Sequence, residues 1–240
     1  MLRNFIKDSA IYAIPQIFSK GINLILLPLY TRVLSPDEYG SLDLLLIFAA
    51  IINVTIALEV SQGLSRFYIT EKDIKKKMLY ASSAFWFTLT VYSILSFLIF
   101  IFAESLSSLI LGKDEMALTL RIGAIYIWIN GIYYLIQHQF RWQFQSKDFA
   151  LASLLMSLTT LLATVILAYY FNYGLNGVIA GLMIGNFIGA IFGILKLSGT
   201  TFTFVFSKKL LLKMIRFSFP LIFASLAVWS SQYIDRIMIN

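Results

Sequence analysis

The 240-residue chain has no cysteine, only one histidine and few acidic residues. The lack of cysteine excludes disulfides and thiol chemistry, although it does not identify the compartment. One histidine and scattered carboxylates give no metal-ligand cluster, so we expect no bound metal. The nucleotide, hydrolase and metalloprotease motifs G-x-x-x-x-G-K-[ST], G-x-S-x-G and H-E-x-x-H are also missing. We expect a protein that is not an enzyme and has no cofactor, which leaves open a coupling ion of unknown identity.

Apolar residues make up 59% of the chain and charged residues only 13%, whereas soluble domains are about 45–50% apolar. Helices need about 20 apolar residues to cross a bilayer, and a barrel would need a two-residue alternation that the chain lacks. The sequence therefore predicts an all-α integral membrane protein, a polytopic helix bundle. Seven segments are long and apolar enough: 10–34, 41–63, 79–103, 117–138, 151–171, 175–196 and 217–239.

A weak internal repeat suggests how the segments are grouped. IPQIFSK surrounds Pro15 and FPLIFAS surrounds Pro220, and each follows a basic stretch and opens a long apolar segment. We therefore predict a six-helix N-terminal lobe over 1–214 and the first helix of a truncated second lobe over 215–240. The chain would then be a fragment of a protein about twice its length, since parallel repeats are a known transporter plan.

Basic residues gather in the loops on one side of the predicted bundle. That side holds Arg3, Lys7, Arg66, Lys72, Lys75, Lys76, Lys77, Arg141, Lys147, Lys196, Lys208, Lys209, Lys213 and Arg216. The other side holds only Arg32, Lys113 and Arg121. The positive-inside rule places the N-terminus in the cytoplasm, and the same residues could also bind lipid headgroups. Because these charges lie in short loops, we expect no nucleic-acid partner.

Several short segments carry local signals. SPDEYG (35–40) predicts a helix end, a Ser cap and a restart at Gly40. Residues 66–78 predict one amphipathic interfacial helix, 104–115 one surface turn of helix, and NYGLNG (172–177) a tight turn. The glycines at 181, 185 and 189 recur every four residues, which predicts a close-packing helix face.

The first apolar segment carries Gln16, Lys20 and Asn23, which share one helical face. A lysine within a bilayer costs roughly 3 kcal/mol or more, so it persists where it faces a partner or water. We interpret this face as the wall of a polar cavity that meets an anionic substrate group such as a phosphate. The alternatives are a structural lysine paired with a carboxylate, or a snorkelling one. Arg32 ends the segment as an interfacial anchor or at the mouth of the cavity.

Two carboxylates stand in segment 41–63, Asp43 near its outer end and Glu59 near its inner end. On one continuous helix they lie on nearly opposite faces, so we expect no acid pair. Each is a candidate for coupling or gating, or else an interfacial charge, and Glu59 could instead neutralise Arg66 or Lys20. Asp235 and Arg236 in the last segment form either an adjacent ion pair or a gate.

The segment 117–138 presents an amide and aromatic stripe. Asn130, Tyr134, Gln137 and Arg141 follow at spacings of four, three and four residues, with Tyr126 and Tyr133 close to the same face. Aromatic rings stack on sugar faces and amides bond sugar hydroxyls, so the stripe suits an oligosaccharide. Interhelical hydrogen bonds with a tyrosine belt would explain it equally. We interpret His138 as structural.

Residues 7–48, above all LPLYTRVLSPDEYG at 27–40, resemble the N-terminal signature of Wzx-type polysaccharide and oligosaccharide flippases. These form the polysaccharide transporter family of the multidrug/oligosaccharidyl-lipid/polysaccharide exporter superfamily, and residues 219–240 resemble its seventh helix. The resemblance implies two six-helix lobes around a cavity that opens alternately to each side. It implies a lipid-linked oligosaccharide, an undecaprenyl-pyrophosphate repeat unit, moved across the bacterial plasma (inner) membrane for surface polysaccharide such as O-antigen or capsule. Lys20 best matches the basic cavity residues of that family.

The resemblance further implies membrane lipids as partners, and the polysaccharide polymerase and glycosyltransferases of the same pathway. Two alternatives belong to the same superfamily, a lipid II flippase and a multidrug antiporter, and the antiporter should show an acidic cation site without a basic cavity. A membrane glycan polymerase should have a large outer loop, which this sequence lacks. A truncated membrane protein that does not transport is the remaining alternative.

Overall fold

The computed structural model describes residues 21–22, 24–111, 113–198 and 202–239. Gln16, Lys20 and Asn23 therefore lie outside the described residues. The described helices are α2 (Pro36–Thr55), α3 (Val60–Thr70), α4 (Ile74–Ile101), α5 (Ala103–Leu111), α6 (Ala117–Trp142), α7 (Ser146–Thr164), α8 (Gly174–Leu197), α9 (Lys208–Ser218) and α10 (Leu221–Ile239), with a 3-10 turn at Asp114–Met116 and a π-helix at Val165–Tyr170. A shorter apolar helix, Leu24–Val33, precedes α2.

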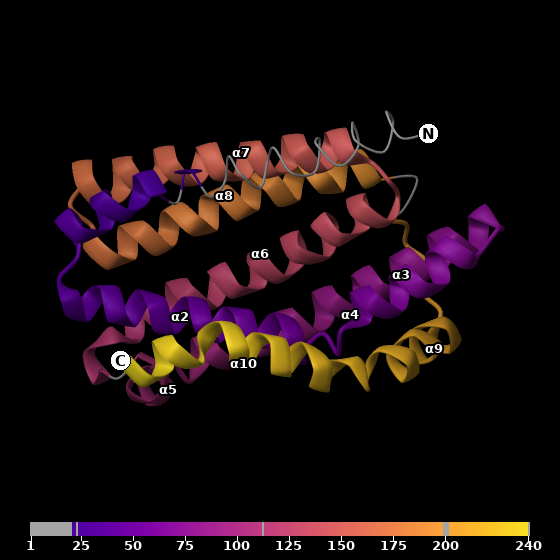
Figure 1. Cartoon of the computed structure of the whole chain (residues 1–240), viewed down its shortest axis with the longest axis horizontal. Coiled ribbons are helices and arrows are strands. Elements are labelled where there is room, and N and C mark those ends of the chain that lie inside the picture. The colour runs from indigo at the N-terminus through magenta and orange to yellow at the C-terminus, as the bar shows by residue number, and fades with distance from the viewer. Residues whose placement is uncertain (1–20, 23, 112, 199–201, 240) are drawn as a thin grey trace.

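Long helices run roughly side by side along the length of the molecule (Figure 1). Five of those described are long and apolar enough to cross a membrane, namely α2, α4, α6, α7 with its π-helical end, and α8. The pair α9 and α10, bent by 50°, makes a sixth if it forms one span. The predicted all-α polytopic bundle is confirmed, and the protein is a multi-pass membrane protein. The division into lobes at 214 and 215 stays a prediction.

The prediction that a helix restarts at Gly40 is wrong, because α2 already begins at Pro36. Ser35 caps it: its Oγ accepts a hydrogen bond from the Glu38 N–H at 3.3 Å, and the Glu38 carboxylate accepts one from the Ser35 N–H at 2.9 Å. This reciprocal pair is a capping box. Pro36 fits the first turn because its missing N–H would have had no intrahelical acceptor there.

The predicted single helix over 41–63 is wrong, because α2 ends at Thr55 and α3 begins at Val60. Leu58 and Glu59 adopt left-handed backbone angles, with φ of 50° and 49°. Each such residue costs roughly 1–2 kcal/mol, so the surrounding structure must hold the break. The Ser218 hydroxyl at the end of α9 does so in part by donating a 2.7 Å hydrogen bond to the Leu58 carbonyl.

The predicted helix over 66–78 is also divided. Helix α3 stops at Thr70, and α4 starts at Ile74 after a three-residue turn. Glu71 accepts hydrogen bonds from the N–H groups of Lys72 and Asp73, and these bonds hold the pKa of its carboxyl below the usual value. Asp73 in turn caps α4 by accepting from the Lys75 N–H at 2.9 Å. Residues 104–115 likewise hold more than the expected turn, since α5 ends only at Leu111.

The predicted close-packing face on α8 is confirmed. A Cβ added at Gly181 would lie 2.8 Å from the Thr164 Cα, and one at Gly185 would lie 2.7 Å from the Met156 carbonyl oxygen. Helices α7 and α8 thus approach too closely for a side chain at either of these glycine positions. At the turn before α8, Asn172 and Gly174 adopt φ of 56° and 51°, which agrees with the tight turn predicted there.

The ends of the bundle differ in charge. Helices α3 and α9 and the turn from α6 to α7 lie at one end, and α5 and the turn from α7 to α8 lie at the other (Figure 1). The first end carries the described members of the large basic set. At the second end Lys113 pairs with Asp37 at 2.8 Å and Arg121 with Glu104 at 2.9 Å, so its basic charge is largely neutralised. Which end faces the cytoplasm stays a prediction.

Candidate functional site: a polar cavity between the helices

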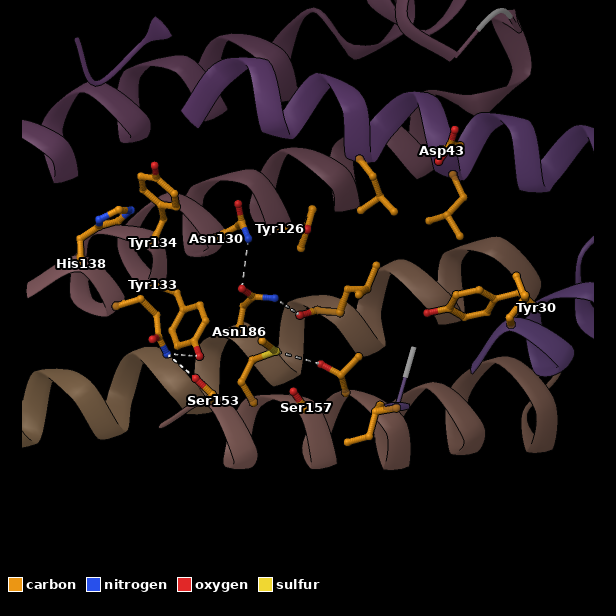
Figure 2. Close-up of a pocket in the computed structure, with 18 of the residues that line it drawn as sticks. Tyr30, Asp43, Tyr126, Asn130, Tyr133, Tyr134, His138, Ser153, Ser157 and Asn186 are labelled. Atoms are coloured by element: carbon orange, nitrogen blue, oxygen red, sulfur yellow. Dashed lines mark hydrogen bonds between the residues drawn. The ribbon is translucent and has the colours of Figure 1, made fainter. Parts of the chain in front are cut away.

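A cavity of about 770 Å³ lies among the helix Leu24–Val33, α2, α6, α7 and α8 (Figure 2). Its lining joins tyrosines, amides and hydroxyls to apolar side chains. It comprises Ile22, Leu27, Tyr30, Tyr39, Leu42, Asp43, Leu46, Tyr126, Asn130, Tyr133, Tyr134, Gln137, His138, Arg141, Phe149, Ser153, Met156, Ser157, Thr160, Leu182 and Asn186. Polar lining among membrane-spanning helices is costly, which marks the cavity as a functional candidate.

A directed chain of hydrogen bonds crosses the bundle beside the cavity. The Tyr92 hydroxyl on α4 donates to Asn53 Oδ1 on α2 at 2.6 Å, and Asn53 Nδ2 donates to Asn130 Oδ1 on α6 at 2.8 Å. Asn130 Nδ2 donates to Asn186 Oδ1 on α8 at 3.1 Å, and Asn186 Nδ2 ends the chain on the Leu182 carbonyl at 2.8 Å. Four helices are thereby joined through three amides, which fixes the register between them.

A second polar group lies further along α6. Gln137 Nε2 donates to the Tyr133 hydroxyl and, at 3.2 Å, to the Ser153 hydroxyl of α7. The other amide atom, Oε1, has no partner among the described residues. A buried acceptor without a donor is unfavourable unless water or a ligand supplies one. Gln137 therefore keeps one acceptor available in the wall of the cavity.

Rings and charges distinguish the two ends of the cavity. The rings of Tyr134 and His138 of α6 are in contact with their centroids 4.4 Å apart and their planes tilted by 59°, and Arg141 lies over the Phe149 ring at 4.8 Å. Asp43 lies toward the other end, on the same side of the view as Tyr30 (Figure 2). The cavity therefore has a carboxylate toward one end and a guanidinium group toward the basic end of the bundle.

The structure brings together eight of the residues named in the sequence analysis, including Tyr126, Tyr133, His138 and Arg141 of α6. Asn130, Tyr134 and Gln137 line the cavity from one helix, and Asp43 lines it from α2. Arg32 is exposed on the short first helix and does not line the cavity. Asp235 and Arg236 fall within α10, but their side chains lie outside the described part. The roles of all these residues stay predictions.

Glu59 lies apart from the large cavity. It borders a void of about 10 Å³ with Asn53, Ser61, Thr88 and Tyr92 among others, and Tyr134 lines both hollows. Asp43 and Glu59 are therefore in different hollows, as the predicted separation requires. The reasoning from one continuous helix was nevertheless wrong, because the left-handed break precedes α3.

Other lining residues were not singled out from the sequence. Ser153, Ser157 and Thr160 follow at spacings of four and three residues on α7, the spacing that identified the stripe on α6. Asn186 stands within the glycine-rich segment 181–189, where only the small residues were considered. Among the described residues, no group of three or more histidines and carboxylates could hold a metal ion.

Comparison with known proteins gives a family and a fold. A protein family described as polysaccharide biosynthesis protein matches residues 29–240. The fold is similar to a MATE crystal structure in the straight conformation, with TM-score 0.74 and 18% identity, and to an outward-facing multidrug resistance MATE family transporter of the MOP superfamily, with TM-score 0.73 and 16% identity. Each match covers 92% of this chain and 52% of the other.

A MOP superfamily transporter from Pyrococcus furiosus, described as having a binding pocket of reverse polarity, matches with TM-score 0.69 and 17% identity. That match also covers 92% of this chain and 52% of the other. The chain thus spans about half the length of these transporters. At such identities the likeness shows the fold alone. No curated protein sequence matches the chain.

Proposed function

Because the chain belongs to the polysaccharide biosynthesis protein family, which its match over residues 29–240 shows, we propose that it forms half of a lipid-linked oligosaccharide flippase. The transporter would move undecaprenyl-pyrophosphate-linked repeat units across the bacterial inner membrane by alternating access. The basic end of the bundle would then face the cytoplasm, by the positive-inside rule. The observation that carries the proposal is the polar cavity among membrane-spanning helices.

The lining of that cavity suits a sugar. Its volume of about 770 Å³ falls within the usual range for small-molecule sites, roughly 300–1,000 Å³. Tyr134 offers a ring and Gln137 an acceptor that no described residue uses. Asn130 is already engaged by Asn53 and Asn186 on neighbouring helices. We therefore assign sugar contact to Tyr134 and Gln137, and to Asn130 mainly the alternative role of joining helices.

The charges suggest how the substrate would be oriented. Arg141 is the described cation that lines the cavity, and it lies toward the basic end. A pyrophosphate approaching from the cytoplasmic leaflet would meet this end first. We propose that Arg141 acts together with Lys20, whose position lies outside the described residues, to attract the anionic group. Guanidinium groups bind phosphate oxygens in bidentate fashion, which favours such a role.

Glu59 is our candidate for energy coupling. It is only 3% exposed, its Oε2 has no partner among the described residues, and the Ser225 hydroxyl of α10 hydrogen-bonds its carboxyl group. A buried carboxylate without a counter-charge favours protonation or a bound cation. Since α10 is the predicted first helix of the second lobe, a change of charge at Glu59 would act on the contact between the lobes.

The test is transport by the full-length protein in cells that lack their own flippase. Tyr134→Leu and Gln137→Leu should each reduce surface glycan strongly while protein abundance in the membrane stays normal. The matched controls are Tyr173→Leu, at an exposed turn, and Gln62→Leu, outside the cavity lining. Normal glycan export by both cavity variants would overturn the proposal.

A second candidate, export of cationic drugs, is favoured by Asp43, the carboxylate that lines the cavity in the described part of the chain. It predicts that Asp43→Asn abolishes a drug-resistance phenotype of the full-length protein. If the protein confers no drug resistance, this candidate is excluded. If Asp43→Asn removes resistance and the Tyr134 and Gln137 variants leave glycan unchanged, drug export replaces the first proposal.

A further inference from the structure

A second hollow, separate from the large cavity, lies at the basic end of the bundle. Its volume is about 280 Å³, and Tyr68 and Ile69 of α3, Lys77 of α4, and the residues Trp142, Gln143 and Phe144 at the end of α6 line it. Small-molecule pockets begin at about 300 Å³, so this hollow suits a headgroup rather than an entire lipid. None of the side chains in this lining is a carboxylate.

The lining of this hollow includes two groups that can only donate hydrogen bonds, the Lys77 ammonium and the Trp142 indole N–H. The Lys77 ammonium lies 5.2 Å from the centre of the Tyr68 ring, and no described carboxylate lies within ion-pair distance of it. The Trp142 indole N–H is buried and finds no acceptor in the part of the chain that the structure describes. A buried donor without an acceptor favours an acceptor supplied by a ligand.

The two acidic residues that precede Lys77 in the sequence accept hydrogen bonds from the backbone. Glu71 accepts from the N–H groups of Lys72 and Asp73, and Asp73 accepts from that of Lys75. A hydrogen bond between Tyr68 and Gln143 joins α3 to the end of α6 in this lining. Burial raises the pKa of the Tyr68 hydroxyl, so Tyr68 stays uncharged, and Lys77 is the one charged side chain among the described residues of the lining.

Phe144 shows which surroundings the hollow faces. Its φ is 57°, in the left-handed region where glycine usually follows a helix end, and its side chain is 78% exposed. The N–H groups of Phe144 and Gln145 bond back to the Arg141 and Phe140 carbonyls at 3.1 and 2.9 Å, which holds this conformation. A bulky aromatic residue is energetically unfavourable in this backbone conformation. Exposure of the ring to water would not offset that cost, whereas contact with lipid acyl chains would. Ile69, half exposed on the facing helix, continues the apolar rim.

We propose that this hollow binds the phosphate of a membrane lipid, with Lys77 and the Trp142 N–H as donors and Phe144 and Ile69 among the acyl chains. The phosphate could belong to an anionic phospholipid or to a prenyl pyrophosphate. The site itself does not depend on the proposed transport function, although the prenyl source would connect it to that function. Charged donors to phosphate give the stronger class of hydrogen bonds.

Native mass spectrometry of the chain in detergent, titrated with phosphatidylglycerol, with farnesyl pyrophosphate, or with phosphatidylcholine, tests the site. Lys77→Gln should weaken retention of one anionic probe by about fivefold to tenfold, the effect expected of one well-placed lysine. Lys76→Gln is the matched control, because it removes the same charge from an adjacent exposed position outside the lining. Trp142→Phe, which keeps an aromatic ring but removes the N–H, should also weaken retention.

Phe144→Gly separates a lipid contact from a structural role. Glycine relieves the left-handed strain, so thermal stability should hold or rise while lipid retention falls. A selective loss with phosphatidylglycerol identifies a phospholipid site, and one with farnesyl pyrophosphate identifies a prenyl-phosphate site. Equal retention by the Lys77→Gln and Lys76→Gln variants with both anionic probes would overturn the proposal, because it would leave only general attraction to the basic surface.

Discussion

Asn53 Nδ2 of α2 donates a hydrogen bond of 2.8 Å to Asn130 Oδ1 of α6, in the middle of a chain that runs from Tyr92 to Asn186. Each amide in this chain donates to one neighbour and accepts from another. Removing Asn53 or Asn130 therefore leaves partners on two other helices unsatisfied. The contact between Asn53 and Asn130 joins α2 to α6, the helix that lines the cavity with the polar stripe. Helix α2 is also the helix that leads into the break at Glu59.

The first prediction concerns this contact. Asn53→Leu should lower the free energy of unfolding by roughly 1–3 kcal/mol, because Tyr92 and Asn130 lose their partner in a buried setting. Thermal unfolding in detergent measures the effect. The double variant Asn53→Leu/Asn130→Leu should cost less than the sum of the two single variants, since each removes the same bond. Strict additivity would show that the two amides are not coupled.

A second prediction tests the packing of α7 against α8. Gly185→Ala places a Cβ 2.7 Å from the Met156 carbonyl oxygen, a backbone atom that cannot move alone. Overpacking of this kind costs roughly 1–3 kcal/mol, which lowers the midpoint of thermal unfolding by several degrees. Gly21→Ala is the matched control, because a Cβ there meets no atom within 4 Å. Equal midpoints for the two variants would contradict the close approach.

A third prediction addresses the anionic group of the substrate. In the full-length protein, Lys20→Ala and Arg141→Gln should each reduce surface glycan sharply while the protein still inserts in the membrane. Lys113→Ala, at the opposite end and paired with Asp37, should leave export unchanged. Quantified surface glycan relative to protein abundance is the measurement. Export at the normal level by the Lys20→Ala variant would remove this lysine from the mechanism.

A fourth prediction concerns coupling. If protonation or cation binding at Glu59 drives the movement of the two lobes relative to each other, Glu59→Gln should make transport independent of the ion gradient. The reason is that the amide neither titrates nor carries charge. Transport into vesicles with and without an imposed gradient measures this. Glu104→Gln, which breaks only an exposed ion pair with Arg121, should retain the dependence. A gradient dependence unchanged by Glu59→Gln would assign this carboxylate a structural role.

A fifth prediction uses the absence of cysteine, which makes single-cysteine labelling possible without a background. Lys113→Cys should react with an impermeant maleimide in intact cells, or in spheroplasts where an outer membrane is present. Lys75→Cys should react only after permeabilisation, because the basic end is expected to face the cytoplasm. The reverse pattern would invert the proposed orientation and place Arg141 at the outer end of the cavity.

The sequence predicted the stripe of Asn130, Tyr134 and Gln137 on one side of α6 because this helix runs unbroken from Ala117 to Trp142. Helical spacing then translates directly into a shared face. The same argument would have located Ser153, Ser157 and Thr160 on α7. Asn186 was less visible, since its neighbours are glycines that suggested packing rather than polar contact.

The break between α2 and α3 could not be predicted in this way. Neither Leu58 nor Glu59 is a helix breaker, no proline stands near them, and the nearest glycine, Gly63, lies within α3. Their left-handed conformation depends on tertiary contacts such as the bond from Ser218, which is 160 residues distant in the chain. The end of α3 at Thr70 reflects a local competition instead, in which Glu71 accepts from two N–H groups of the turn and Asp73 accepts from the Lys75 N–H at the start of α4.

The glycine contacts on α8 have a mechanical consequence. At Gly181 and Gly185 the α8 backbone lies directly against the α7 backbone and the Thr164 and Thr160 side chains, with no free space, so the pair resists sliding and bending. Helices α7 and α8 should therefore move together as one rigid body during any rearrangement of the bundle. The cavity would then open and close through motion of α2, which ends at the break before α3, rather than by separation of α7 from α8.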